Sequence, residues 1–165
     1  KLFAHEWSEV NPDIMTIAKA IGNGFPLGAC LTSKKVGEKM DFGSHGSTFG
    51  GNPLACTVGN AVLDIMLKDK FFSEINVVAK KLYKGLQNVI IDFPSVIEDV
   101  RGRGFILGLK CKAENDRFVN IAREQYILTV KASDNVVRLL PPINLNSKEC
   151  DEAIEKIRAT CSKFK

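Results

Sequence analysis

The sequence lacks several features that would assign it to a specialised class of protein. It has no apolar run of the roughly 18 residues that a membrane helix needs, and its net charge is only +4. Its lysines are spread along the chain, with no dense basic block interleaved with aromatic residues. With 45% hydrophobic and 25% charged residues, the composition is that of an ordinary soluble globular protein. We expect neither a membrane nor a nucleic-acid partner.

The cysteines and histidines also argue against common kinds of site. The five cysteines are an odd number and form no CxxC pair, which disfavours a disulfide framework and a zinc site. Reduced, partly buried thiols of a cytoplasmic protein account for them better. The only two histidines, His5 and His45, have no Cys, Asp or Ser arrangement that suggests a catalytic triad. We therefore expect a cytoplasmic protein without a bound metal.

The beginning of the sequence is unusual. The first residue is Lys1 rather than Met, and no signal peptide follows it. Residues 2–7 resemble a segment from inside a folded domain. The length of 165 residues suffices for one domain or for one and a half. We expect the chain to be a fragment of a longer protein.

Residues 1–72 contain two glycine-rich loops on either side of a short apolar run. Residues 12–22 suggest a short helix or turn that leads into the first loop. The apolar run at 27–32 is typical of a buried strand, and the second loop covers 43–53. A helix then begins at Pro53, a residue well suited to a first helical position. This part has the pattern of the end of a larger α/β domain.

Residues 73–165 alternate between helical and strand patterns, as in a compact α+β unit. A long amphipathic helix over 71–93 leads into this unit and ends before Pro94. The further expected elements are strands at 96–100, 105–111, 127–130 and 136–140, turns at 101–104 and 134–135, and helices at 117–125 and from the N-cap Ser147 onward. We therefore expect an α/β fold class, divided into domains 1–72 and 73–165.

Lys19 is a candidate nucleophile. It lies among apolar residues, directly before the glycine-rich loop Gly22–Pro26. An apolar setting disfavours the charged form of an amine and leaves the neutral, nucleophilic form available. Such an amine can attack the carbonyl carbon of an aldehyde cofactor. The alternative is an ordinary helix lysine whose stem lies on apolar surface while its charge reaches water.

Ser47 and Thr48 are candidate ligands of an anion. They lie in the second loop, between glycines. Hydroxyl and backbone N–H groups in such a loop can hold an oxyanion such as phosphate. The alternative is a plain turn without a ligand.

Arg138 is a candidate carboxylate ligand. It lies in an otherwise apolar strand that ends at Pro141–Pro142. A buried arginine without a partner is costly, so we expect Arg138 to meet a carboxylate. Its planar fork suits bidentate binding of a small carboxylate substrate. The alternative is a structural salt bridge with an acidic residue of the protein.

Three of these segments resemble one family. Thr16–Pro26 is similar to the cofactor-lysine motif of the class III aminotransferases, Thr-x-x-Lys-Ala-x-Gly-x-Gly-(Phe or Tyr)-Pro, and fills every fixed position. His45–Pro53 resembles the family's loop His-Gly-(Ser or Thr)-Thr-(Phe or Tyr)-Gly-Gly-Asn-Pro. Residues 138–142 resemble its Arg-Leu-x-Pro-Pro segment. The resemblance covers nearly the whole chain.

The resemblance implies a fold-type I transferase that uses pyridoxal 5′-phosphate. Residues 1–72 would be the C-terminal portion of its large domain with the interdomain helix, and 73–165 its small C-terminal α+β domain. Lys19 would carry the cofactor, and Thr48 would bind the cofactor phosphate of the neighbouring subunit. Ser47 and Arg138 would contact the substrate. The active site would therefore be shared across a homodimer.

Within this family, the amino-acid sequence is most similar to that of the acetylornithine-type members in three stretches: the start of the chain, residues 58–64 and residues 134–142. The implied reaction moves the δ-amino group of N2-acetylornithine to 2-oxoglutarate, in arginine biosynthesis. Ornithine, succinylornithine and 4-aminobutyrate are alternative donors. The sequence does not include the family's residues that bind the near side of the phosphate, pair with the pyridine nitrogen and stack on the cofactor ring. A second substrate-binding arginine of the family is also absent from it. We therefore expect little turnover from this chain alone, and the alternative is a non-catalytic domain with a folding or association role.

Overall fold

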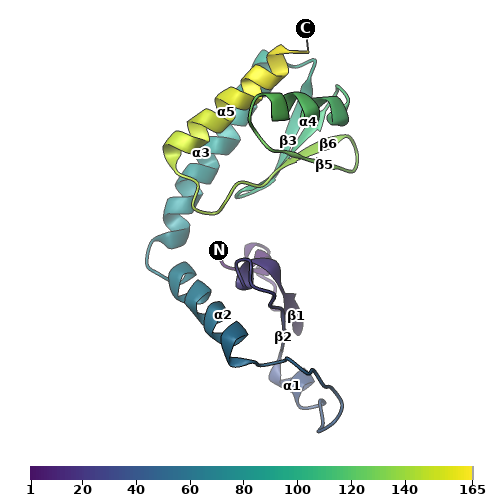
Figure 1. The fold of residues 1–165 in the computed structure, drawn as a ribbon, viewed down its shortest axis with the longest axis vertical. Helices are drawn as coiled ribbons and strands as arrows, with labels where there is room; N and C mark the ends of the chain where they lie inside the picture. Colours follow the sequence, from purple (N-terminus) through teal and green to yellow (C-terminus); the bar gives the residue numbers. More distant parts are fainter. Residues whose placement is uncertain (165) are drawn as a thin grey trace. The chain divides into compact units, whose positions relative to one another are not determined.

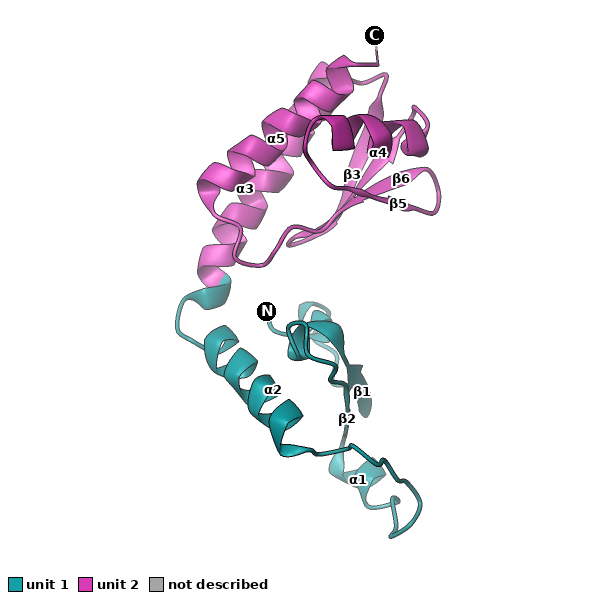
Figure 2. Cartoon of the chain, viewed as in Figure 1, with its two compact units in different colours: residues 1–72 teal, residues 73–165 magenta. Residues whose placement is uncertain are grey.

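The chain folds into two compact units, Lys1–Phe72 and Ser73–Lys165. The structure is a computed structural model, and it describes residues 1–164 (Figures 1 and 2). The two units differ in how much apolar surface they bury, and nearly all of the buried apolar residues belong to the second.

The first unit is built around a small antiparallel sheet. Strand β1 (Ile14–Ile17) pairs with β2 (Ala29–Thr32), so that Ile17 lies opposite Ala29. The short helical elements are η1 (Ala4–Trp7), η2 (Lys19–Ile21) and α1 (Lys34–Gly37). The connection between the two strands carries Lys19.

Two expectations for this unit are wrong in part. The turn expected within residues 12–22 is present as η2, but Ile14–Ile17 form a strand, because the β-branched side chains of Ile14, Thr16 and Ile17 favour extended backbone and the segment pairs with β2. The strand expected at 27–32 is shorter, and all four residues of β2 are exposed. In the described residues β2 pairs with β1 alone, and none of its four side chains is buried.

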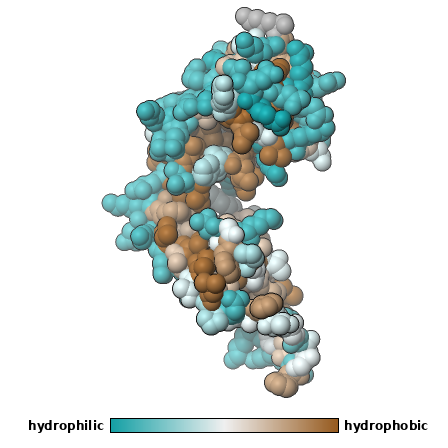
Figure 3. Space-filling view, in the orientation of Figure 1, coloured by the Kyte–Doolittle hydropathy of each residue, from teal (hydrophilic) through white to brown (hydrophobic). Residues whose placement is uncertain are grey.

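Helix α2 (Pro53–Met66) begins where the sequence indicates. The side-chain oxygen of Asn52 accepts a hydrogen bond from the backbone N–H of Ala55 at 2.9 Å, which caps the helix, and Pro53 occupies its first position. Only Ala55 and Gly59 of this helix are buried. Apolar side chains therefore gather on the surface over α2 (Figure 3), with Leu54 and Ile65 more than half exposed.

The second unit is an antiparallel sheet with three helices. The sheet has the order β3-β4-β6-β5, formed by β3 (Ile97–Arg103), β4 (Ile106–Cys111), β6 (Val136–Leu139) and β5 (Val130–Ala132). The helices are α3 (Phe71–Asp92), α4 (Asn115–Glu124) and α5 (Ser147–Ser162). The long helix expected at 71–93 and the helix expected at 117–125 are thus confirmed to within two residues.

The core of this unit lies on one face of the sheet. Leu107 and Leu109 of β4 and Val137 of β6 are buried together with Leu86 of α3 and Phe118 of α4. Since side chains alternate between the two faces of a strand, the intervening residues of β4 and β6 lie on the opposite face. That face carries Arg138, and no helix of the described residues buries it.

Three boundaries in the second unit differ from those expected. Strand β3 continues through Arg101–Arg103, and the turn that follows is only Gly104–Phe105. Strand β5 begins at Val130, where the strand expected at 127–130 was to end. Asn146, rather than Ser147, caps α5, because its side-chain oxygen accepts from two backbone N–H groups of the first turn.

Candidate active site

Lys19 is held in an unusual backbone conformation. It follows β1 by two residues, and its φ of 55° lies in the left-handed region that non-glycine residues rarely adopt. The turn is closed by a hydrogen bond from the N–H of Gly22 to the carbonyl of Lys19, at 3.0 Å. A side chain at Gly22 would place its Cβ 2.0 Å from the carbonyl oxygen of Phe25, so this turn requires glycine. Strained residues of this kind cluster at functional sites.

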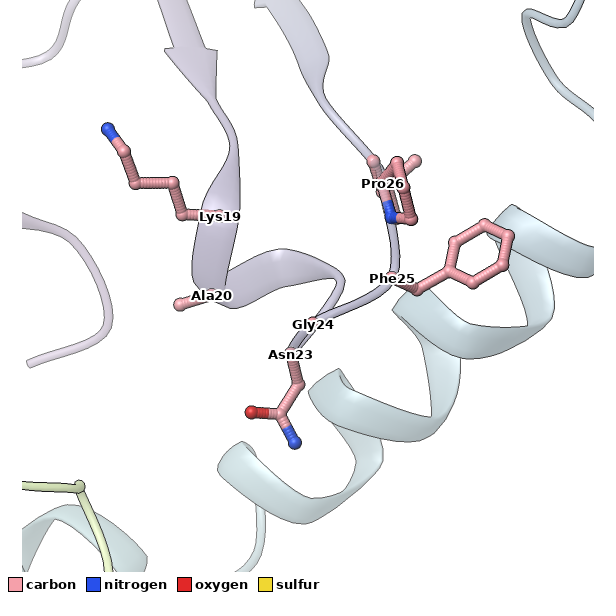
Figure 4. A pocket seen from close by; sticks show the side chains of 7 residues that line it. Lys19, Ala20, Asn23, Gly24, Phe25 and Pro26 are labelled. Atoms are coloured by element: carbon pink, nitrogen blue, oxygen red, sulfur yellow. The ribbon is translucent and has the colours of Figure 1, made fainter.

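The Lys19 side chain lines a pocket of about 390 Å³, which is formed by two neighbouring stretches of the chain, Lys19–Ala20 and Asn23–Leu27. It extends away from the backbone, and the Phe25 ring points in the other direction (Figure 4). The expected apolar enclosure is wrong for the described residues, because Lys19 is exposed along with Ala18 and Ala20. Its ε-amino group makes no ion pair or hydrogen bond within residues 1–164, so no protein group of this part of the chain occupies it.

The loop that contains Ser47 and Thr48 is anchored to the start of α2. The side-chain amide of Asn52 donates to the carbonyl of Phe49 at 2.8 Å, and the N–H of Gly50 donates to the carbonyl of Ser47 at 3.4 Å. Thr48 lies between these two anchored carbonyls and is exposed. Its hydroxyl has no hydrogen-bond partner in the described chain, so it is available to an external oxyanion.

Arg138 lies on the uncovered face of the sheet in the second unit. It is directly opposite Gly108 on β4 and Val130 on β5. Arg138 is exposed, so the expectation of a buried arginine is wrong, since alternation along β6 turns it away from the core. No acidic residue in the part of the chain described here pairs with it. The structural salt bridge considered as the alternative is therefore also absent from residues 1–164.

The predicted site residues fall into both units. Lys19, Ser47 and Thr48 belong to the first unit and Arg138 to the second. Within the first unit, neither Ser47 nor Thr48 lines the pocket at Lys19. Among the described residues, no group of three or more His, Cys, Asp or Glu side chains is arranged to hold a metal ion. None of the described helices is both long and apolar enough to span a membrane.

Sequence reasoning missed Asn52 and Asn135 as residues that organise these sites. Asn52 caps α2 and holds the loop of Thr48, as an asparagine before a proline at a first helical position indicates. The sequence placed Asn135 in a turn, and the structure confirms this with φ values of 58° and 50° at Asp134 and Asn135. Nothing in the sequence revealed which groups the Asn135 side chain contacts.

The family follows from comparison with known proteins. The family model for class III aminotransferases matches residues 1–161, so the chain belongs to this family, whose members use pyridoxal phosphate. The α/β fold is confirmed by the solved structures that it matches. One is the N-acetylornithine aminotransferase from Stenotrophomonas maltophilia, with 33% identity, a TM-score of 0.85, and coverage of 99% of this chain and 43% of that chain. Another is an ornithine aminotransferase from Plasmodium yoelii, with 27% identity, a TM-score of 0.91, and coverage of 100% of this chain and 44% of that chain.

Two curated relatives are more similar in sequence. The acetylornithine aminotransferase of Mesorhizobium japonicum is 52% identical over 159 residues, which are 96% of this chain and 40% of that protein. The acetylornithine aminotransferase of Brucella melitensis is 46% identical over 164 residues, which are 99% of this chain and 41% of that protein. The chain thus spans about two fifths of the length of these relatives.

The residues of the first unit fit the family's cofactor. Pyridoxal phosphate presents an aldehyde and a phosphate, and it therefore needs an amine and an oxyanion site. Lys19 offers an amine with no partner in the described chain, beside a pocket. Thr48 offers a free hydroxyl in a loop whose neighbouring carbonyls are already bonded.

Proposed function

We propose that the protein is an aminotransferase that moves the δ-amino group of N2-acetylornithine to 2-oxoglutarate, giving N-acetylglutamate semialdehyde and glutamate. The observation that carries the proposal is Lys19, which combines a left-handed backbone, a free amine and the family's cofactor-lysine motif. The choice of donor is supported by the two curated relatives above, both named acetylornithine aminotransferase. The reaction would serve arginine biosynthesis.

The residues have distinct parts in this proposal. Pyridoxal phosphate, when bound, supplies a carbonyl carbon for attachment of amino groups and a ring that withdraws electrons from the neighbouring carbon. Lys19 is the attachment residue, and its amine, once released, can take a proton from the substrate carbon and return it. Thr48 binds the phosphate. Ser47 and Arg138 contact the substrate, with the guanidinium of Arg138 binding a carboxylate.

We also propose the architecture that the resemblance implies, a fold-type I transferase. Residues 1–72 belong to the large cofactor-binding domain and include the interdomain helix, and 73–165 form the small C-terminal domain. A cytoplasmic location is part of the same proposal, because the buried free thiols of Cys111, Cys150 and Cys161 stay reduced there.

The proposed partner is a second copy of the protein. The segment on either side of Thr48 exposes large apolar side chains, with Met40 more than half exposed, Phe49 at 80% and Phe42 fully exposed. Exposed apolar surface of this kind marks protein interfaces. An interface here supports a site in which Thr48 of one subunit binds the phosphate held by Lys19 of the other.

Mixing two inactive variants of the full-length protein tests the shared site. Lys19→Ala removes the attachment residue, and Thr48→Glu places a carboxylate against the phosphate. If the residues of one site come from different subunits, a mixed dimer has one doubly damaged site and one intact site. We expect mixing to restore up to roughly a quarter of the wild-type activity, the share expected from random pairing. No recovery in demonstrably mixed dimers would show that Lys19 and Thr48 act within one subunit.

The substrate is tested by a donor panel. The full-length protein, supplied with pyridoxal phosphate and 2-oxoglutarate, is assayed with acetylornithine, succinylornithine, ornithine and 4-aminobutyrate. We expect kcat/KM to be highest with acetylornithine and to vanish in Lys19→Ala. A preference for 4-aminobutyrate or ornithine would overturn the assigned donor, and turnover with none of the four would favour a non-catalytic role.

A further inference from the structure

Two asparagines tie together the end of the sheet that carries Arg138. The side-chain amide of Asn135 donates to the carbonyls of Cys111 and Ala113, at 2.7 and 3.0 Å, and its oxygen accepts from the N–H of Asn115 at 3.0 Å. The side-chain amide of Asn115 in turn donates to the carbonyls of Ala132 and Val136, at 3.1 and 3.2 Å. Both N–H bonds of each amide group are therefore used.

This network is at the point where three elements meet. Cys111 ends β4, Asn115 begins α4, and Ala132 and Val136 are the facing residues that close the turn between β5 and β6. Asn115 is only 7% exposed, so its amide would be costly to leave unbonded. The network thus joins the tip of the β5–β6 hairpin to the elements on either side of it.

The turn between β5 and β6 also depends on Asn135. Asp134 and Asn135 both have positive φ, a backbone conformation that Asp and Asn adopt more readily than most residues, within the three residues that connect Ala132 to Val136. On the other side of the turn, the ammonium group of Lys110 donates to the carbonyl and carboxylate of Asp134, at 2.6 and 2.7 Å. Asn135 therefore contributes both a backbone conformation and a side-chain clamp, and the two contributions can be separated by mutation.

Arg138 depends on the register that this clamp fixes. It lies three residues after Asn135 on β6, about 10 Å along the strand. A slip of one residue in β6 would turn the arginine toward the buried face of the sheet. Gly108, opposite Arg138, has no side chain to hold it in place, so the strand position decides where the guanidinium lies.

We propose that Asn135 is a positioning residue for Arg138, which fixes strand β6 through its bonds to Cys111, Ala113 and Asn115 and so holds the guanidinium where it binds the substrate carboxylate. The inference rests on the proposed function, since it assumes that Arg138 binds the substrate. In this role Asn135 acts through Arg138 and does not itself contact the substrate.

Asn135→Gly is the sharpest variant, because glycine keeps the positive φ and removes only the amide. Asn120→Ala is its matched control, since Asn120 is exposed on α4 and its side chain has no hydrogen bond in the described chain. In the full-length enzyme we expect Asn135→Gly to raise the KM for 2-oxoglutarate about tenfold and to change kcat less than about twofold, the pattern of weakened substrate binding. Asn120→Ala should change neither.

A double-mutant cycle with Arg138→Gln separates positioning from general destabilisation. If Asn135 acts through Arg138, its effect on KM disappears when Arg138 is already replaced, because residues that act as a unit are not additive. An effect of Asn135→Gly that persists in full beside Arg138→Gln would overturn the inference, and so would an unchanged KM in Asn135→Gly itself.

The single variant Arg138→Gln shows whether the proposed role of Arg138 itself is wrong. Arg138→Gln alone must raise the KM for 2-oxoglutarate, and if it does not, the proposed role of Arg138 fails and the inference fails with it. If Asn135→Gly gives no folded protein, Asn135→Asp replaces it in the cycle. Aspartate tolerates the positive φ and removes the two N–H donors to the carbonyls of Cys111 and Ala113, and the same outcomes apply.

Discussion

The side-chain amide of Asn52 donates to the backbone carbonyl of Phe49 at 2.8 Å, while its oxygen caps α2 by accepting from the N–H of Ala55 at 2.9 Å. One side chain thus joins the loop of Thr48 to the start of the helix. The position of the Thr48 hydroxyl therefore depends on a residue that need not touch the cofactor.

Asn52→Ala should weaken cofactor binding without removing any cofactor ligand. We expect the helix to lose about 1 kcal/mol through its missing cap and the Kd of pyridoxal phosphate to rise roughly three- to tenfold. Titration of the full-length protein, followed by cofactor absorbance, measures the Kd. Asn60→Ala, on an exposed position of the same helix, is the control, and an equal Kd in the two variants would contradict this account.

Thr48→Val tests the hydroxyl itself, since valine has nearly the same shape. A hydrogen bond to a charged phosphate contributes about 1.5–3 kcal/mol, so the Kd of pyridoxal phosphate should rise about 10- to 100-fold. Ser44→Ala removes a different exposed hydroxyl from the same loop and should leave the Kd unchanged. A change of less than about twofold in Thr48→Val would show that Thr48 does not hold the phosphate.

The local features of this protein could be predicted from its sequence. Pro53 marks the start of α2, the apolar periodicity of α3 predicts its extent, and Asp134–Asn135 identifies a turn. Each of these depends on neighbours within one or two turns of the chain. The motif around Lys19 likewise indicates the family, because its fixed positions lie within 11 consecutive residues.

Burial could not be predicted in the same way. Arg138 lies between apolar neighbours and was expected to be buried, yet alternation along β6 leaves it exposed. The strand β2 is apolar in sequence but exposed in the described residues. Whether an apolar or charged side chain is covered depends on partners far away in the sequence, which local patterns do not specify.

Gly102 and Gly104 should differ in their tolerance of a side chain, although both have positive φ. A Cβ at Gly102 would lie 2.0 Å from the backbone oxygen of Ile106, whereas a Cβ at Gly104 meets nothing within 4 Å. We expect Gly102→Ala to cost more than about 3 kcal/mol and Gly104→Ala about 1–2 kcal/mol. Urea unfolding measures both, and similar midpoints for the two variants would contradict the structure of this hairpin.

The buried thiols should make the second unit less stable in alkali. Burial raises the pKa of Cys111 to about 11 and that of Cys161 to about 12. The folded state therefore keeps both thiols neutral while the unfolded chain ionises near pH 8.5, so their contribution is complete below about pH 8.5 and is lost as the pH rises toward 11. Within that range each thiol lowers the free energy of unfolding by about 1.4 kcal/mol per pH unit.

The variant Cys161→Ala should flatten this pH dependence, whatever its effect on stability at pH 7. Cys56→Ala replaces an exposed thiol and should leave the slope unchanged. Urea unfolding at several pH values between 7 and 10 provides the comparison. The same slope in Cys161→Ala as in the unmodified protein would show that this thiol is not the titrating group.

Lys19 is the residue that we propose carries the cofactor. The full-length protein is incubated with pyridoxal phosphate, reduced with borohydride, digested and analysed by mass spectrometry, with Lys19→Arg as the control. We expect a pyridoxyl group on the peptide that contains Lys19 and little on exposed lysines such as Lys34 and Lys35. A folded protein with no adduct at Lys19, or with equal labelling of all three lysines, would contradict the account.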